Sequence, residues 1–210
     1  MDEHRDARAD LPVRGTPATL VQAAPPASVA LATVRGWEVG GAGLVVTARI
    51  GTTPEAVALL GGGPAWLSTR TPGGGLVVLA ATARTIPGRH DELLLTGGTD
   101  LAHEVRRSAV RAPLDRPAVL LTATGPHPAR ALDLSRTGCR LRVGPEDADL
   151  ALDDRVALEL DLTDGPPLHA LARVLRVDPA HRLLAVHFEG LSAQDGERVD
   201  HAVFSALSRS

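Results

Sequence analysis

Short runs of alternating apolar and polar residues make up most of this chain, and they fall into two series that meet near residue 100. An alternation with a period of two is typical of half-buried strands. Glycine and proline separate the runs, as expected for the turns of a small barrel or sandwich. The first series predicts strands at residues 28–35, 43–50, 65–71, 76–85 and 92–96.

The second series continues the pattern with clearer alternation, best seen where Val156, Leu158, Leu160 and Leu162 share one face. Turn-forming sequences follow this run and recur after the next one. Six short antiparallel strands are consistent with a closed barrel, which leaves no strand edge exposed. The predicted strands lie at residues 117–124, 129–134, 139–143, 155–162, 168–178 and 183–189.

The end of the chain has a helical period instead. Ser192 is a favourable N-cap, and Asp195 stands three residues later. Val199, Val203 and Leu207 form an apolar stripe, supported by alanines on the same face. We expect this helix to pack on the second barrel; a helix that binds a partner protein is the alternative.

These patterns predict an all-β fold of two small β-barrel domains in tandem, the second a six-stranded antiparallel barrel with a C-terminal helix. Residues 1–27 are polar and then rich in alanine and proline, which predicts a disordered tail. The N-terminal β domain is expected at residues 28–100 and the second domain at 101–210. Residues 104–112 are expected to link the two domains.

The composition favours some classes of protein and disfavours others. The chain has 210 residues, 44% hydrophobic and 22% charged, as in globular proteins. The net charge of −3 and the aromatic content of 2% disfavour nucleic-acid binding. Neither a membrane-length apolar run nor a signal-peptide pattern is present, which predicts a cytoplasmic protein without membrane insertion. Cys139 is the single cysteine and is expected to be a small buried residue.

Catalytic signatures are missing from the sequence. All 22 basic residues are arginine, so a phosphate-binding loop of the Walker type, which needs lysine, is excluded. The eight histidines form no His-x-x-x-His or His-Glu-x-x-His pair, and no serine stands in a Gly-x-Ser-x-Gly context. We therefore expect a protein that is not an enzyme and uses neither a metal nor a cofactor.

One constellation does suggest binding chemistry: Arg107 and Arg111, followed by Asp133, Ser135 and Gly138. Arg-x-x-x-Arg alone is common by chance in a chain with 22 arginines. Asp-x-Ser-x-x-Gly is expected only about 0.06 times in a chain of this composition, although a motif remains a hypothesis until its structural context is known. Taken separately, the arginines also fit a solvated basic linker, and the Asp and Ser fit a turn at the end of a strand.

In this order and spacing, the motif resembles the ligand signature of PilZ domains, and the resemblance extends over residues 104–208. It implies a six-stranded antiparallel barrel that binds cyclic di-GMP. The implied ligand residues are Arg107, Arg111, Asp133, Ser135 and Gly138, with Arg106 as a third phosphate contact. Two features depart from many relatives. No aromatic residue flanks the arginines, and Ala185 stands where a glycine is common in the last strand.

The residue types suit that ligand. The planar arginine fork binds phosphate oxygens or the guanine edge in a bidentate way. The Asp133 carboxylate accepts hydrogen bonds from guanine N–H groups, and Ser135 can donate, accept or close a local turn. Gly138 permits a positive φ or a close approach of the backbone to a ring.

The layout of the first half resembles the N-terminal β domain of YcgR-like flagellar brake proteins, without a motif. This resemblance implies a receptor in which cyclic di-GMP, held by the arginines of the linker, changes the domain orientation and the contacts with a protein of the motility, secretion or polysaccharide machinery. The alternative is a degenerate PilZ module that binds a protein partner and no nucleotide.

Overall fold

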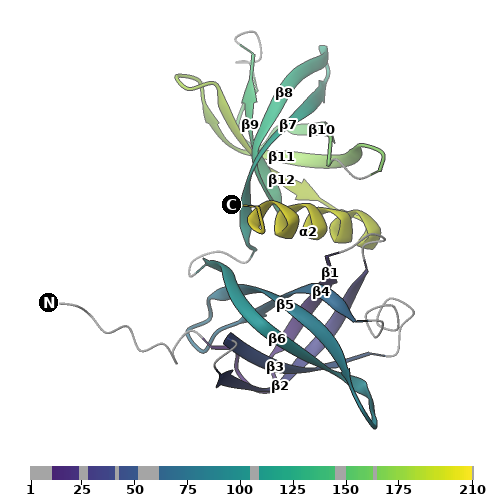
Figure 1. The fold of residues 1–210 in the computed structure, drawn as a ribbon. Helices are drawn as coiled ribbons and strands as arrows, with labels where there is room; N and C mark the ends of the chain where they lie inside the picture. Colours follow the sequence, from purple (N-terminus) through teal and green to yellow (C-terminus); the bar gives the residue numbers. More distant parts are fainter. Residues whose placement is uncertain are drawn as a thin grey trace, which may run out of the picture. The chain divides into compact units, whose positions relative to one another are not determined.

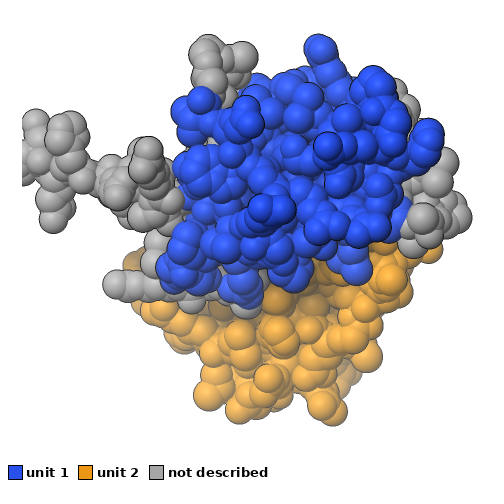
Figure 2. All heavy atoms as spheres, turned by 90° about the horizontal axis from the view of Figure 1, so that it is seen from below, with its two compact units in different colours: residues 1–110 blue, residues 111–210 orange. Residues whose placement is uncertain are grey.

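The computed structural model divides the chain into two compact units, residues 1–110 and residues 111–210 (Figure 2). Each unit is a sheet closed into a barrel (Figure 1). The structure describes residues 11–23, 28–40, 43–51, 62–104, 109–144, 150–162 and 165–209.

The first unit is a closed antiparallel barrel with the strand order β1-β2-β3-β6-β5-β4. Alternate side chains of its strands point inward, and leucine, valine and alanine fill the centre, as the scarcity of aromatic residues requires. Leu20, Val34, Leu67 and Leu93 are each at most 1% exposed. The strands are β1 (Pro17–Gln22), β2 (Val29–Gly40), β3 (Gly43–Ile50), β4 (Gly63–Arg70), β5 (Leu76–Ile86) and β6 (Arg89–Glu104).

The prediction of a disordered tail over residues 1–27 is wrong for Pro17–Gln22, which forms β1. This strand pairs with β2 on one side and with β4 on the other, and so closes the barrel. Leu20 and Val21 are fully buried. The strand is only six residues long, and its neighbours are rich in proline and alanine, so long-range pairing rather than local pattern defines it. Residues 1–10 and 24–27 of the predicted tail lie outside the described residues.

Strand β6 is much longer than the five-residue run expected at 92–96. It pairs with both β3 and β5 and continues to Glu104. Residues 101–104, which we had assigned to the second domain and the start of the linker, therefore belong to the last strand of the first unit.

The second unit confirms the expected six-stranded antiparallel barrel with a terminal helix. The strand order is β10-β11-β12-β9-β8-β7, and the sheet closes on itself. Leucines dominate its core, with Leu120, Leu134, Leu141 and Leu160 fully buried. The strands are β7 (Arg111–Thr122), β8 (Gly125–Ser135), β9 (Gly138–Val143), β10 (Arg155–Leu160), β11 (Leu168–Asp178) and β12 (Leu183–Glu189).

Helix α2 (Ala193–Leu207) packs on β7 and β8 of the second barrel (Figure 1). Ser192 caps its first turn, because the Ser192 Oγ atom accepts a hydrogen bond from the Asp195 amide at 3.0 Å. The predicted stripe faces the barrel through Val199 and Val203, and Phe204 is buried beside it. In the described part of the chain, no helix has the length and apolar character needed to cross a membrane.

Candidate ligand-binding site

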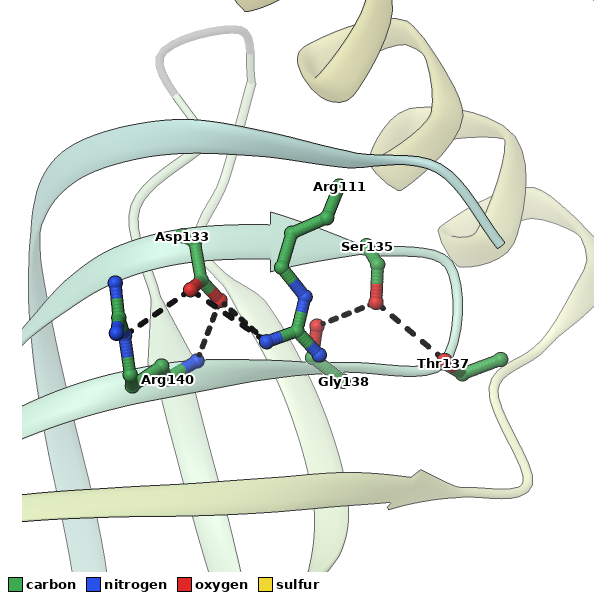
Figure 3. Close-up of polar contacts among 6 residues, drawn as sticks. All are labelled: Arg111, Asp133, Ser135, Thr137, Gly138 and Arg140. Atoms are coloured by element: carbon green, nitrogen blue, oxygen red, sulfur yellow. Dashed lines mark hydrogen bonds and ion pairs between the residues drawn. The ribbon is translucent and has the colours of Figure 1, made fainter. Parts of the chain in front are cut away.

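The hairpin of β8 and β9 brings the Asp-x-Ser-x-x-Gly residues together. Ser135 pairs with Gly138 across a turn of two residues, and Asp133 pairs with Arg140 two positions further along. On the other side of β8, Arg111 opens β7 directly opposite Ser135. Antiparallel register therefore places Arg111, Asp133, Ser135 and Gly138 at one end of three neighbouring strands (Figure 3).

The Asp133 carboxylate lies between two guanidinium groups. Its Oδ1 atom is 3.3 Å from Arg111 Nη1 and accepts a hydrogen bond from the Arg140 amide at 3.0 Å. Its Oδ2 atom is 3.1 Å from Arg140 Nε (Figure 3). The Asp133 side chain is only 10% exposed. A buried carboxylate needs such partners, because unpaired burial of a charge is costly.

Arg140 was not among the residues predicted from the motif. It lies two residues after Gly138, on the outward face of β9, and its side chain is 49% exposed. The sequence feature that could have identified Arg140 is the alternation of apolar and polar residues along this strand. Residues two apart on a strand share a face, so Arg140 follows the motif glycine onto the face where Asp133 lies.

Ser135 is an internal part of the turn. Its hydroxyl donates a hydrogen bond to the Gly138 carbonyl oxygen at 3.0 Å and lies 3.4 Å from Thr137 Oγ1 (Figure 3). The residue is 2% exposed. Ser135 thus closes the turn locally, which is one of the two roles that the sequence allowed.

Gly138 makes a close backbone approach to β12. A Cβ atom added at this position would overlap the Val186 carbonyl oxygen and lie 3.1 Å from His187 Cα. The neighbouring Thr137 carbonyl accepts a hydrogen bond from the Phe188 amide at 2.9 Å. Glycine is required here so that the β8–β9 turn can lie against the last strand.

Arg111 has unused donor capacity. Its side chain is 32% exposed, and its Nε atom is buried without an acceptor among the described residues. Arg106 and Arg107, the other two predicted phosphate contacts, lie outside the described residues. Of the predicted ligand residues, the structure therefore brings together Arg111, Asp133, Ser135 and Gly138.

Cys139 is 1% exposed, as expected for a small core residue. Burial is the main cause that raises the pKa of its thiol, and the negative charge of Asp133 adds to it. Burial and a raised pKa both disfavour the thiolate form, as expected for an inert core cysteine. Within the described ranges, no group of three or more His, Cys, Asp or Glu side chains is arranged to hold a metal ion.

Solved structures that resemble the chain have low sequence identity to it. YcgR of Escherichia coli in complex with c-di-GMP is 16% identical, with a TM-score of 0.42, and the match covers 93% of this chain and 84% of that one. The Bacillus subtilis inhibitor of motility, MotI/DgrA, is 10% identical, with a TM-score of 0.43 and coverages of 94% and 97%. The MrkH–c-di-GMP complex of K. pneumonia is 11% identical, with a TM-score of 0.42 and coverages of 93% and 88%.

A search of curated proteins finds no match to the chain. Among protein families, the model of the PilZ domain matches residues 105–205, a range that includes Arg111, the hairpin of β8 and β9, and most of α2. No catalytic family is indicated. The match identifies residues 105–205 of the chain as a PilZ domain.

Proposed function

We propose that this protein is a receptor for cyclic di-GMP. The binding residues would be Arg111, Asp133, Ser135 and Gly138, together with Arg106 and Arg107 from the segment before β7. The observation that carries the proposal is the arrangement at Asp133, where a nearly buried carboxylate lies beside arginine forks at the end of the β8–β9 hairpin. Family membership supports the same ligand.

The arrangement gives complementary chemistry to the two kinds of group in the ligand. Two phosphates need cationic donors, and Arg111 has both a partly exposed guanidinium group and a buried Nε donor. The guanine N–H donors need an acceptor, which the Asp133 carboxylate supplies. Ser135 and Gly138 fix the turn, so the carboxylate is preorganised rather than ordered by the ligand.

Binding on this scheme is an exchange of partners. The Asp133–Arg111 contacts, at 3.3 and 3.5 Å, are long for a charge-assisted hydrogen bond. A guanine edge that takes Asp133 Oδ2 and displaces the long Arg111 contact to Oδ1 would free the Arg111 fork for a phosphate. The hydrogen bond from the Arg140 amide to Asp133 Oδ1 can persist during this exchange, because the guanine edge takes the other oxygen.

The experiment is a calorimetric titration with cyclic di-GMP, with GTP as the ligand control. Wild type should bind with micromolar or tighter affinity, and Arg111→Ala should lose binding by a factor on the order of a hundred, as expected for charge-assisted hydrogen bonds. Arg176→Ala, which removes an exposed arginine from β11, is the matched control and should bind like wild type. An equal loss in both variants would contradict a specific site.

The alternative proposal is a degenerate module that binds a protein partner and no nucleotide. The observation in its favour is that the Asp133 carboxylate is already paired by Arg111 and Arg140, so the site is stable without a ligand. Absence of binding by calorimetry and by a second method in wild type would favour this alternative. A protein partner would then bind equally well to wild type and Arg111→Ala.

We further propose that the ligand changes the orientation of the two domains, because Arg106 and Arg107 fall, in the sequence, between β6 of the first unit and β7 of the second. A ligand shifts such an equilibrium only if it binds one orientation better than the other. Small-angle scattering at saturating ligand should show a changed domain spacing, and an unchanged profile would refute the switch. Neither messenger turnover nor a metal requirement is expected of this receptor.

A further inference from the structure

The turn between β8 and β9 is fastened to helix α2 by one arginine. Arg136 is the first residue of that turn, and its Nη1 atom forms an ion pair with Asp200 Oδ2. The Asp200 side chain is only 15% exposed. Since Asp200 lies on α2, this pair connects the ligand motif to the terminal helix.

Gly196 makes room for this contact. It is buried within α2, and a Cβ atom added to it would come within 2.6 Å of Arg136 Nε. The guanidinium group therefore occupies the space that a side chain on the helix would take. Glycine is less favourable than alanine inside a helix. Its position under Arg136 is consistent with a requirement for that space.

Movement of Arg136 would be transmitted directly to the candidate site. Arg136 stands between Ser135, which bonds to the Gly138 carbonyl, and Thr137, which bonds to the Phe188 amide. The turn has only two residues, so it has little freedom to absorb a displacement. The hairpin is thus held by β12 on one side and by α2 through Arg136.

We propose that Arg136 is a positioning residue that couples the ligand site to helix α2, by binding Asp200 in the space above Gly196. Occupancy of the site then biases the position or stability of α2, and a partner that holds α2 biases ligand affinity by the same factor. This inference rests on the proposed function, since the ligand in question is cyclic di-GMP.

Gly196→Ala provides the decisive variant. It keeps the charges of Arg136 and Asp200 and raises the helix propensity of α2. Its methyl group displaces the guanidinium end of Arg136. We expect the gain in helix propensity to offset part of the cost of separating Arg136 from the nearly buried Asp200, so that the protein stays folded. The affinity for cyclic di-GMP should fall about tenfold, within the usual range of coupling between sites. Arg136→Ala should cause a similar loss, and the double variant should lose no more than either single one.

Ser205→Ala on the same helix is the matched control, and its affinity should equal that of wild type. If wild type binds and Gly196→Ala binds equally well, the coupling is refuted and the ion pair is only structural. A second measurement separates this failure from failure of the proposed function. Hydrogen exchange of the Arg140 amide, which donates to Asp133, should be faster in Gly196→Ala than in Ser205→Ala even without ligand.

If wild type does not bind cyclic di-GMP but the Arg140 amide exchanges faster in Gly196→Ala, the coupling between α2 and the hairpin stands and the ligand assignment fails. If wild type does not bind and the exchange rates are equal, both proposals are wrong.

Discussion

At the scale of single residues, Asp133 is the member of the proposed site with the most internal contacts, so on our proposal it limits how strongly a ligand can bind. One of its oxygens accepts a hydrogen bond from the Arg140 amide, and the carboxylate also contacts the guanidinium groups of Arg111 and Arg140. A ligand must therefore compete with internal ion pairs, and its affinity reflects the difference between the two sets of contacts. Electrostatic contacts of this kind fix orientation and specificity as much as affinity.

Substitution of Arg140 would test whether the ligand competes with internal ion pairs for Asp133. Its guanidinium group is half exposed, so it adds a cation at the proposed ligand site but is screened by solvent. Arg140→Ala should weaken cyclic di-GMP binding by about threefold to tenfold, much less than Arg111→Ala, and should reduce the salt dependence of the affinity. Titrations at two salt concentrations would measure both effects. Tighter binding in Arg140→Ala would instead identify Arg140 as a competitor for Asp133.

Gly138 is the residue where one added methyl group should matter most. In Gly138→Ala, the new Cβ atom would overlap the backbone of Val186, so the β8–β9 turn and β12 would have to separate. Destabilisation of about 2–4 kcal/mol is expected, in the range for strained or overpacked sites. Chemical denaturation measures it. Gly73→Ala, where the added atom meets only a side-chain oxygen at 4.0 Å, should change stability by much less.

At the scale of elements, the terminal helix depends on its first turn. Ser192→Ala removes the acceptor for the Asp195 amide and should lower the stability of the second unit by about 1 kcal/mol. A thermal melt would show this as a lower transition temperature. Ser205→Ala, near the other end of the helix, removes only an exposed hydrogen bond from Arg209 and should be nearly neutral.

Most strands were predictable because each has its own apolar face. The ranges expected for β3, β11 and β12 agree with the structure at both ends. The failure at β1 has a physical cause, because a six-residue strand is defined by its partners β2 and β4 rather than by its own pattern. The length of β6 was missed for a related reason. Gly97 and Gly98 interrupt its apolar run, yet the strand continues through irregular pairing with β5.

The site was predictable only where spacing fixes geometry. Asp133, Ser135 and Gly138 are close in sequence, so a hairpin turn gathers them. Arg140 was within reach of the same argument, because the register of the β8–β9 hairpin and the alternation along β9 place it beside Asp133. Arg136 could not be assigned in that way, because its partner on α2 is 64 residues away. That contact depends on how the helix packs on the barrel, which no local pattern encodes.

At the scale of the whole molecule, stability should depend on pH through Asp200. Burial raises the pKa of this carboxyl to about 6, against the opposing effect of Arg136 and with a smaller contribution from Glu197. Between pH 3.8 and about pH 6, the Asp200 carboxyl is therefore protonated in the folded state and ionised in the unfolded chain. The contribution of the protonated Asp200 carboxyl to the free energy of unfolding is fully present below pH 3.8, and it is lost as the pH rises through about 6.

Comparison with Asp200→Asn isolates this effect. Wild-type stability relative to the variant should fall between pH 4 and pH 7, by at most roughly 3 kcal/mol. Denaturation curves at several pH values would measure the difference. Asp178 gives the opposite control, because a hydrogen bond from His181 lowers the pKa of its carboxyl. Stability relative to Asp178→Asn should fall as the pH decreases, and the same trend in both variants would contradict the assignment.

Because both sheets are closed, the ways in which a partner protein could bind this molecule are restricted. Every strand of the two described barrels has a neighbour on each side, so neither sheet has an edge strand that is free along its whole length. A binding partner cannot extend either sheet by adding a strand along a full edge, which is a common mode of recognition in β proteins. Recognition is then expected to rely mainly on side chains, on the outer surfaces of the barrels, on their connecting loops or on α2. If the protein has a downstream partner, surface substitutions could change the specificity for it without any change to the hydrogen-bonded framework that holds the ligand motif.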